Sequence, residues 1–457
     1  MSYRQILHLG CALALAGCTT VDIRPDVTPL RGAIGDRAGA DILLHDGATP
    51  SSHADRVNQL ASAPLTMASA VELALTESPE LQARYAEIGI ASAEMAAATE
   101  LVNPVLEVMA RPTAHPREMA NLEFGLTQNL YNLLTRDSRR RVATEAFEAE
   151  TLEIAADVVE TAAEVRRHYV ELVAARHHLR AKVEAAEATS AAAELAAALH
   201  TAGNISDLEL AHDKLEADEG AIEAMKAELS VNEMMPAFAS LIGLGDRDLL
   251  VPDQLPDLPA SDPSIDGLEQ IALTRRLDVA SSRKAVDRAH ADLKARVDWR
   301  LWDELNLGFS AEREGDGAWA IGPILEISLP LVARGNPDVA EAIAVTLKAE
   351  NELKAAEAKA KSDVRIAVAR LQAARGVVQR YLSSLLPLKR SVVELTQREY
   401  NFMIVGAFDL LEAKRDESQA IGEYVEALAG YWQARVDLSE AIGGVEIAMP
   451  VTVENAS

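Results

Sequence analysis

The chain of 457 residues carries 71 acidic and 44 basic side chains, which gives it a formal net charge of −27 at pH 7. Binding to nucleic acid needs clustered lysine and arginine, so this balance excludes a nucleic-acid partner. The abundance of Ala, Glu, Leu, Lys and Arg is typical of long or coiled helices. The acidic surplus either keeps such rods soluble or lines an acidic passage.

The N-terminus carries a candidate lipoprotein signal. An apolar stretch from Ile6 to Ala16, too short to span a bilayer, ends at Leu15-Ala16-Gly17-Cys18. This ending resembles a bacterial lipoprotein box, in which the cysteine thiol takes a diacylglycerol. The resemblance implies that residues 1–17 are a signal peptide, that Cys18 is lipidated (with palmitate among the acyl chains), and that Thr19 favours sorting to the outer membrane. The alternative is an ordinary signal peptide with an incidental cysteine.

The rest of the first half predicts an arm, two helices, a strand pair and two long helices. Residues 18–64 show no sustained hydrophobic period and predict an extended, lipid-anchored arm. Thr66 can cap a helix that Pro79 interrupts, and a longer helix resumes to about residue 100. Segments 105–111 and 121–128 alternate apolar and polar side chains and predict strands. A rod without Gly or Pro over 137–199 breaks at Gly203 before a return helix at about 207–241.

The second half repeats the first about 200 residues later. Ala74-Leu75-Thr76 is matched by Ala272-Leu273-Thr274, the strands recur near 305–312 and 321–331, and the break at Gly203 recurs at Gly406. This spacing indicates a duplication, with repeats at 65–243 and 266–444, a Pro-rich connector at 244–265 and a tail at 445–457. Pro387 inside the second rod, with no counterpart in the first, predicts that the two halves curve differently.

The four predicted strands cannot stand alone. In lipid, each open sheet edge leaves unpaired backbone groups that cost several kcal/mol each. We therefore expect other copies of the chain to close the edges, although this argument leaves the number of copies open. No segment after the signal offers about 18 continuous apolar residues, and we expect any membrane crossing to be made by strands. The polar faces of the strands, which suit a water-filled lumen, carry Glu107, Glu123, Glu312 and Glu326.

These features together resemble the outer-membrane efflux proteins, of which TolC is the namesake. The resemblance extends from about Leu65 to Gly444 and rests on the two helix openings, on Ile327-Ser328-Leu329-Pro330-Leu331 and on the turn around Val405-Gly406-Ala407-Phe408-Asp409. It implies a mainly α fold with a small β portion, in which a homotrimer forms a 12-stranded β-barrel continuing into an α-helical periplasmic tunnel. It also implies a passive exit duct in the outer membrane, with a periplasmic adaptor and an inner-membrane pump as partners.

The resemblance places the turns at Gly203 and Gly406 at the periplasmic tip, where an adaptor docks. A reversing chain needs Gly in any case, and a left-handed C-cap suits it. The apolar Val405 and Phe408 favour docking, since a solvated tip would be polar. Asp207 matches an acid that helps to hold the tip shut in the family, but Asp207 and Asp409 also suit plain helix caps. Ala407 and Phe408 stand where some relatives carry a basic gate residue, which suggests an apolar constriction.

No other chemistry emerges from the sequence. Three histidines on the first rod, His168, His177 and His178, do not share an i, i+4 metal site, so we expect a solvated helix surface there. No phosphate loop, zinc-protease motif or nucleophile elbow is present, and we expect neither an enzyme nor a cofactor. The lumen acids either favour cations or form a plain polar lining.

The main alternative function is a lipid-anchored periplasmic coiled-coil adaptor or scaffold without a channel. Such adaptors carry β-rich domains around one helical hairpin, whereas this chain has two equivalent hairpins. The sequence does not decide the cargo. The acidic lining favours metal ions or small toxic organic molecules over peptides.

Overall fold

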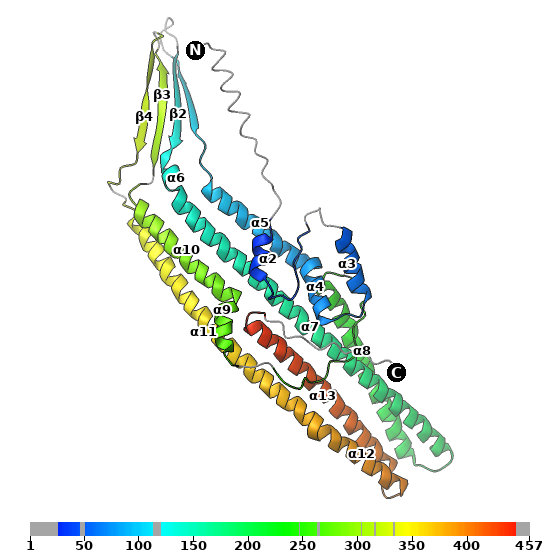
Figure 1. Ribbon diagram of the computed structural model, residues 1–457. Helices are drawn as coiled ribbons and strands as arrows, with labels where there is room; N and C mark the ends of the chain where they lie inside the picture. Colours follow the sequence, from blue (N-terminus) through cyan, green and yellow to red (C-terminus); the bar gives the residue numbers. More distant parts are fainter. Residues whose placement is uncertain are drawn as a thin grey trace.

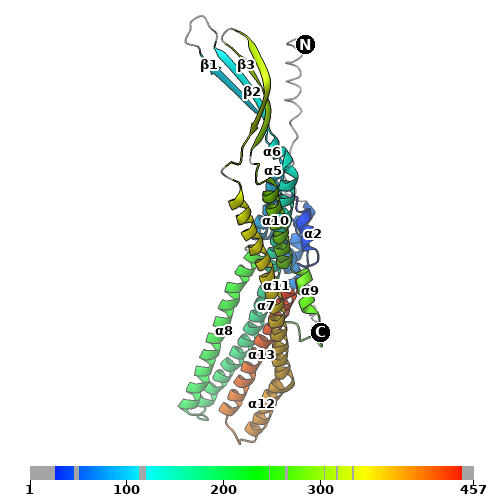
Figure 2. The same ribbon diagram turned by 90° about the vertical axis from the view of Figure 1, so that its left-hand side faces the viewer.

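The computed structural model of the chain describes residues 26–45, 51–112, 120–245, 247–262, 266–302, 304–314, 317–331 and 334–444. The proposed signal peptide, the lipidation site Cys18 and the tail at 445–457 lie outside the described residues. The molecule is elongated, with a sheet at one end, two helical hairpins at the other and short helices packed around the middle (Figures 1 and 2). Among the described helices, none has both the length and the apolar composition needed to cross a membrane.

The first repeat follows its sequence pattern closely. Its elements are α4 (Met67–Glu77), α5 (Pro79–Thr99), β1 (Val105–Arg111), β2 (Asn121–Asn129), α6 (Leu130–Leu134), α7 (Arg136–Thr201) and α8 (Asp207–Leu241). Thr66 caps α4 through its hydroxyl, which accepts the amide of Ser69 at 3.1 Å. Helix α7 has 66 residues, which at the usual rise per residue is about 100 Å. It connects the sheet to the far end of the molecule (Figure 1).

The second repeat contains the corresponding elements. They are α9 (Leu268–Arg275), α10 (Leu277–Trp299), β3 (Leu305–Arg313), β4 (Trp319–Ile327), α11 (Asn336–Arg380), the π-helical turn η1 (Tyr381–Leu385), α12 (Leu386–Asn401) and α13 (Ala407–Ala441). The expected strand at 321–331 ends earlier, at Ile327, because Pro330 has no amide hydrogen to extend the ladder. The amide of Ser328 makes one last bond, to the carbonyl of Glu304 at 3.2 Å.

The duplication shows in the hydrogen bonds that end equivalent helices. After α7, the amide of Asn204 bonds the carbonyl of Leu199 at 2.9 Å, and after α12 the amide of Ile404 bonds the carbonyl of Glu399 at 3.0 Å. These positions differ by 200 residues, and α8 and α13 have 35 residues each. The two halves of the chain are therefore copies of one unit down to their turns.

Proline does interrupt the second rod. The turn η1 lies directly before α12, and Pro387 occupies the first turn of α12. The amide of Leu386 bonds the carbonyl of Tyr381, five residues back. A proline supplies no amide hydrogen and its ring crowds the preceding turn, so the helix accommodates it with one wider turn. In the first repeat, α7 passes the corresponding region as unbroken α-helix.

The N-terminal arm is not simply extended, as the sequence pattern had suggested. It contains α2 (Thr28–Ile34) and α3 (Ser51–Ser62), and only the described segment between them is without regular structure. Leu30 and Ile34, one helical turn apart, are fully buried against the body. This local i, i+4 pair was too short to register as a period. The arm thus contributes to the core at mid-height of the molecule.

The core lies where both repeats, the arm and the connector meet. Helix α7 supplies a continuous buried stripe that includes Ile154, Val158 and Val165. The connector, which has no helix or strand over 247–262, still buries several of its apolar side chains. Trp432 of α13 is buried beside it and donates its indole N–H to the carbonyl of Pro256 at 2.9 Å. The connector is therefore part of the packed body.

Candidate functional site

The four strands form one antiparallel sheet in the order β1-β2-β3-β4, so all four alternating segments are paired (Figure 1). The two hairpins join through β2 and β3, where Phe124 is opposite Ala311. Strands β1 and β4 lie at the edges, and neither has a second partner among the described residues. Each edge exposes unpaired backbone amides and carbonyls, which is a template for pairing with another chain.

One face of this sheet is apolar and exposed. Side chains on one face recur every second residue, and the register aligns this set across all four strands. Phe124 stacks on Trp319, with ring centroids 6.3 Å apart. The large exposed apolar residues on this face are Leu106, Val108, Leu126, Leu307, Phe309, Trp319, Ile321, Leu325 and Ile327. A monomeric soluble protein rarely exposes so large a contiguous apolar surface.

The opposite face holds all four acids that the sequence predicts for a lumen. Glu123 is directly opposite Glu312, and Glu107 is opposite Gly125, one pair further along the same face. Glu326 pairs with Asn306, whose amide donates to its carboxylate at 3.0 Å. Only one cation joins them in the described strands: Arg111 donates to the Glu123 carboxylate at 3.0 Å. This face therefore carries a net negative charge.

The α7–α8 turn, at the end opposite to the sheet, is polar (Figures 1 and 2). Gly203 takes the left-handed conformation with φ 75°. Ser206 caps α8 and exchanges side-chain and backbone hydrogen bonds with Glu209. The backbone amide of Ser206, which donates to the Glu209 carboxylate, lowers the pKa of that carboxyl. The Asp207 carboxylate is 2.7 Å from Nε2 of His200, so Asp207 closes the turn back onto α7 and is not itself the cap.

The α12–α13 turn corrects one prediction about glycine. Gly406 is not the left-handed residue, since its φ of −81° and ψ of 171° are extended. It precedes the first residue of α13, and its amide donates to the Asp409 carboxylate at 2.9 Å. The left-handed residue is Met403, with φ 57°. The structural equivalent of Gly203 is thus Met403, and the equivalent of Gly406 is Ser206. The overall spacing of about 200 residues therefore holds, and only the pairing of Gly203 with Gly406 is three residues out of register.

The same turn exposes apolar side chains that the sequence analysis did not select. Phe402, Met403 and Ile404 are 78%, 94% and 70% exposed. Val405, which the sequence did select, is half-buried, and Phe408 lies in the first turn of α13 with a side chain outside the described part of the structure. The sequence signal for this surface is the apolar run Phe402-Met403-Ile404-Val405, which directly precedes Gly406. We call Phe402, Met403 and Ile404 the apolar tip.

Near this end, one ion pair lies within the second hairpin and another joins the two hairpins. Lys389 of α12 is 2.5 Å from the Asp416 carboxylate of α13. Arg415 on α13 reaches Glu216 on α8, at 3.8 Å, and so links the two repeats. The Lys389 ammonium holds the pKa of Asp416 below its ordinary value. A basic gate residue directly after Gly406 is absent, yet the Arg415–Glu216 pair does join the hairpins further up the rods.

The three α7 histidines considered for a metal site, His168, His177 and His178, are not all solvated. His168 is half-exposed, between Glu164 and Glu171. His177 and His178 are half-buried, and the Nδ1 atom of each is buried with no hydrogen-bond partner. Burial lowers the pKa of both imidazoles. The expectation of a solvated helix surface is therefore wrong for these two residues.

Comparison with known proteins gives concordant results. Residues 70–243, which cover most of the first repeat, match the family model of the outer membrane efflux proteins. The cobalt-zinc-cadmium resistance protein CzcC of Cupriavidus metallidurans is 22% identical over 395 residues, which cover 84% of this chain and 91% of CzcC. The CmeC outer membrane channel of Campylobacter jejuni superposes with a TM-score of 0.68 at 16% identity over 85% of this chain and 86% of CmeC.

The outer membrane protein VceC of Vibrio cholerae gives a TM-score of 0.67 at 16% identity, over 85% of this chain and 96% of VceC. Both solved structures share the fold over 85% of this chain. The fold is thus that of TolC-like outer membrane efflux channels, and the first repeat matches the family model of these proteins. Its family and structural neighbours are channel proteins and not enzymes.

Proposed function

We propose that the chain is the passive outer-membrane exit duct of a tripartite efflux pump that exports divalent metal ions or other small toxic solutes. Three copies would contribute four strands each to a 12-stranded barrel, with the long helices continuing as a periplasmic tunnel. A periplasmic adaptor and an inner-membrane pump would complete the path. The similarity to CzcC, a cobalt-zinc-cadmium resistance protein, supports metal ions as the cargo class.

The observation that carries this proposal is the two-faced sheet with two open edges. The exposed apolar face, with Ile321 77% and Phe309 66% exposed, would be stable against lipid. The acidic face would then line water. Because the sheet has an even number of antiparallel strands, β4 of one copy and β1 of the next would meet antiparallel, and a ring closes without a mismatched pair. A scaffold without a channel gives no use for such a sheet.

We further propose that the apolar tip is the adaptor's docking surface. Three large apolar side chains exposed in succession on a turn cost solubility and point to a protein partner. The polar turn at Gly203 would form the second, more weakly binding half of the same surface. Asp207 would hold the conformation of this turn, and Gly406 with Asp409 would hold that of the α12–α13 turn. Docking would shift the paired helices and open the tunnel, with diffusion carrying the cargo out. The energy would come from the inner-membrane pump.

Lipidation of Cys18 would anchor the arm in the outer membrane beside the barrel. The acids Glu107, Glu123, Glu312 and Glu326 would form rings of negative charge once repeated by symmetry, and these rings would favour cations. The lipidation proposal rests on the sequence signal at Cys18, and the proposal of charged rings rests on the shared face of the sheet. Neither requires a cofactor.

Cysteine cross-linking between edge strands tests the duct directly. Single cysteines placed along β1, around Val108, and along β4, around Ile321, are combined in pairs and oxidised in intact outer membranes. We expect covalent trimers for the pairs that face each other across the closing seam. The matched control moves the first cysteine to inner strand β2, at Leu126, and should give no intermolecular product.

A metal-efflux assay then tests the function. A strain that lacks its own duct, and that carries the cognate adaptor and pump, should regain zinc or cobalt tolerance with this chain. Tolerance should disappear when the tip variant Phe402→Ser with Ile404→Ser is used, although that variant still forms trimers. Cross-linking that yields only monomers would refute the duct, whereas trimers without metal tolerance would refute only the cargo.

A further inference from the structure

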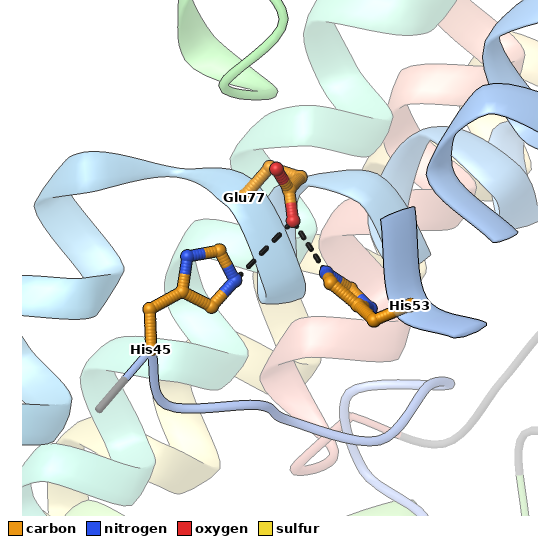
Figure 3. A group of neighbouring side chains, drawn as sticks. All are labelled: His45, His53 and Glu77. Atoms are coloured by element: carbon orange, nitrogen blue, oxygen red, sulfur yellow. Dashed lines mark hydrogen bonds and ion pairs between the residues drawn. The ribbon is translucent and has the colours of Figure 1, made fainter. Parts of the chain in front are cut away.

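Three potential metal ligands from separate segments converge beside α3 and α4 (Figure 3), away from both the sheet and the tip (Figure 1). His45 and His53 both belong to the arm, the first in the segment after α2 and the second on α3, and Glu77 is the last residue of α4. Their ligand atoms, one from each residue, all lie within 4.8 Å of one another. Nε2 of His53 is 2.6 Å and Nε2 of His45 is 3.4 Å from the same oxygen, Oε1 of Glu77.

The geometry is close to that of a bound zinc ion. Zinc ligands at about 2.0–2.2 Å in a tetrahedral arrangement lie roughly 3.4 Å from one another. The His45–Glu77 distance of 3.4 Å already has this value. The His53–Glu77 distance of 2.6 Å would have to widen by a side-chain rotation, and the two rings, whose centroids are 5.5 Å apart and nearly perpendicular, would turn toward the ion.

Surrounding contacts fix the backbone that carries these ligands. Gln82 of α5 accepts the amide of His45 at 2.8 Å and donates to the carbonyls of Leu43 and Thr76 at 2.7 and 2.9 Å. One side chain therefore ties the end of the arm to the end of α4. Arg56, one turn after His53, makes a two-pronged pair with Glu72 at 2.7 and 2.8 Å. That pair holds α3 against α4 and engages the Arg56 guanidinium with Glu72.

The site is protected yet open on one side. The side chains of His53 and Glu77 are 15% and 21% exposed, and that of His45 is 37% exposed. A cavity of about 500 Å³, lined by His53, Glu72 and Thr76 together with arm residues, borders it. Three protein ligands and room for water are the pattern of a zinc site with an open fourth position. An isolated hydrogen-bonded pair would need only one of the two histidines.

We infer that His45, His53 and Glu77 bind a divalent borderline metal ion, with Zn²⁺ as the expected occupant. Two imidazoles and one carboxylate suit zinc, cobalt and nickel; the absence of sulfur from the set disfavours copper(I), and the nitrogens disfavour magnesium and calcium. The ion would join two segments of the arm to α4. This inference does not rest on the channel function, because its three ligands lie in the arm and α4 and include no residue of the sheet or the tip.

Zinc binding by the whole chain tests the inference. The full-length protein, purified as it assembles and with an affinity tag free of histidine, is dialysed against Zn²⁺ and analysed for metal content and by competition with a chelator. We expect one tight ion per chain. His53→Gln and Glu77→Gln should each weaken binding by at least about tenfold, the scale of losing a group that holds a metal site together. Co²⁺ in place of zinc should give the visible spectrum of a four-coordinate ion with nitrogen and oxygen ligands.

Two controls keep the result interpretable. His290→Gln removes a histidine that faces a single carboxylate, Glu350 at 3.6 Å, and should leave zinc binding unchanged. His45→Gln alters the most exposed ligand, so it tests the site even where His53→Gln impairs folding. Hydrogen exchange at residues 41–45 should slow on zinc addition in the parent and not in His45→Gln. Equal zinc affinity in the parent, His45→Gln and Glu77→Gln would overturn the inference.

Discussion

Gly203 and Met403 occupy the same left-handed position, directly after two equivalent helices, with φ of 75° and 57°. A side chain with a Cβ costs about 1–2 kcal/mol there, whereas glycine pays no steric cost. Each residue ends its helix with the same bond to a carbonyl three residues back, at 2.8 Å in both turns. The two tips thus share one backbone and differ in chemistry: the second accepts strain to place a methionine at the apex.

Met403→Gly should therefore stabilise the chain. The substitution relieves the left-handed strain, although the greater freedom of glycine in the unfolded chain partly offsets this relief. The free energy of unfolding should rise by about 0.5–1 kcal/mol. The reverse experiment is Gly203→Ala, whose Cβ meets no neighbouring atom, so it should destabilise the chain by the same net amount of about 0.5–1 kcal/mol. Urea unfolding measures the change in the free energy of unfolding for both variants. A stabilised Gly203→Ala would contradict the assignment of the two turns.

The same Met403→Gly variant separates stability from docking. If the exposed methionine contributes to adaptor binding, as we propose, the more stable variant should bind the adaptor more weakly. Affinity measured with the isolated adaptor, beside the urea midpoint, gives both quantities. Tighter binding together with higher stability would argue against an apolar docking surface at this turn.

Removing the cap of α8 should loosen the polar tip. Ser206→Ala deletes the hydroxyl that accepts the Glu209 amide at 3.3 Å, and loss of such a cap costs about 1 kcal/mol. Hydrogen exchange in the first turn of α8 should accelerate, while that in α13 stays as it is. The control is Gly406→Ser at the equivalent position of the second repeat, which adds a cap and should slow exchange in α13.

A charge on the apolar sheet face should prevent insertion into the membrane. Phe309→Lys places an ammonium on the face that we assign to lipid, at a cost of about 2–4 kcal/mol near the bilayer midplane. Ser310→Lys, the adjacent residue on the acidic face close to Glu312, should be tolerated. Heat-modifiable trimers in outer-membrane fractions measure both. Equal trimer yields would contradict the assignment of the faces.

Acid should destabilise the rods through His178. Burial, aided by Lys182, lowers the pKa of His178 below 6.5, although Glu426 and Glu223 act in the opposite direction. The unfolded chain then takes up a proton at a higher pH than the folded chain. The free energy of unfolding should therefore fall as pH drops from 7.5 through 6.5, and level off only below the folded pKa.

His178→Gln, which is neutral at every pH, should flatten part of this dependence of Tm on pH. His290→Gln serves as the control, because His290 is half-exposed beside Glu350. His177 contributes a slope in the same direction, since burial also lowers its pKa. An unchanged Tm profile for His178→Gln would show that the imidazole titrates alike in the folded and unfolded chains.

Sequence patterns predicted the long helices and the strands well, because a helix without Gly or Pro gives a long uninterrupted run and a strand gives a strict two-residue alternation. The run without Gly or Pro from Asp137 to Leu199 corresponds to α7, and the alternation at Val105–Arg111 matches β1 residue for residue. All four predicted lumen acids share one face because a two-residue period fixes the face of a strand once its register is known. The proposed roles of these acids remain predictions.

The features that the sequence did not predict have a common physical cause. Contacts with distant parts of the chain decide the structure of these short segments, and a local sequence pattern does not contain those contacts. Helix α2 is held by burial of Leu30 and Ile34 in a core built from distant segments, and seven residues show no period. Gly406 looked like a turn glycine, but only backbone angles distinguish an N-cap from a left-handed C-cap. His45, His53 and Glu77 share no sequence spacing, since three separate segments bring them together.

The arm's seat has a consequence for the order of synthesis. Arg37 donates to the carbonyl of Arg275, which is 238 residues further on, and Gly444 packs against Arg37 so closely that a Cβ there would lie 2.5 Å from the Arg37 carbonyl oxygen. These contacts add the start of the second copy and the last described residue to a seat that α7 also forms, through Arg166, which donates to the carbonyl of Ala38. The first segment of the body to leave the ribosome can therefore complete its contacts only after the final helix has been translocated.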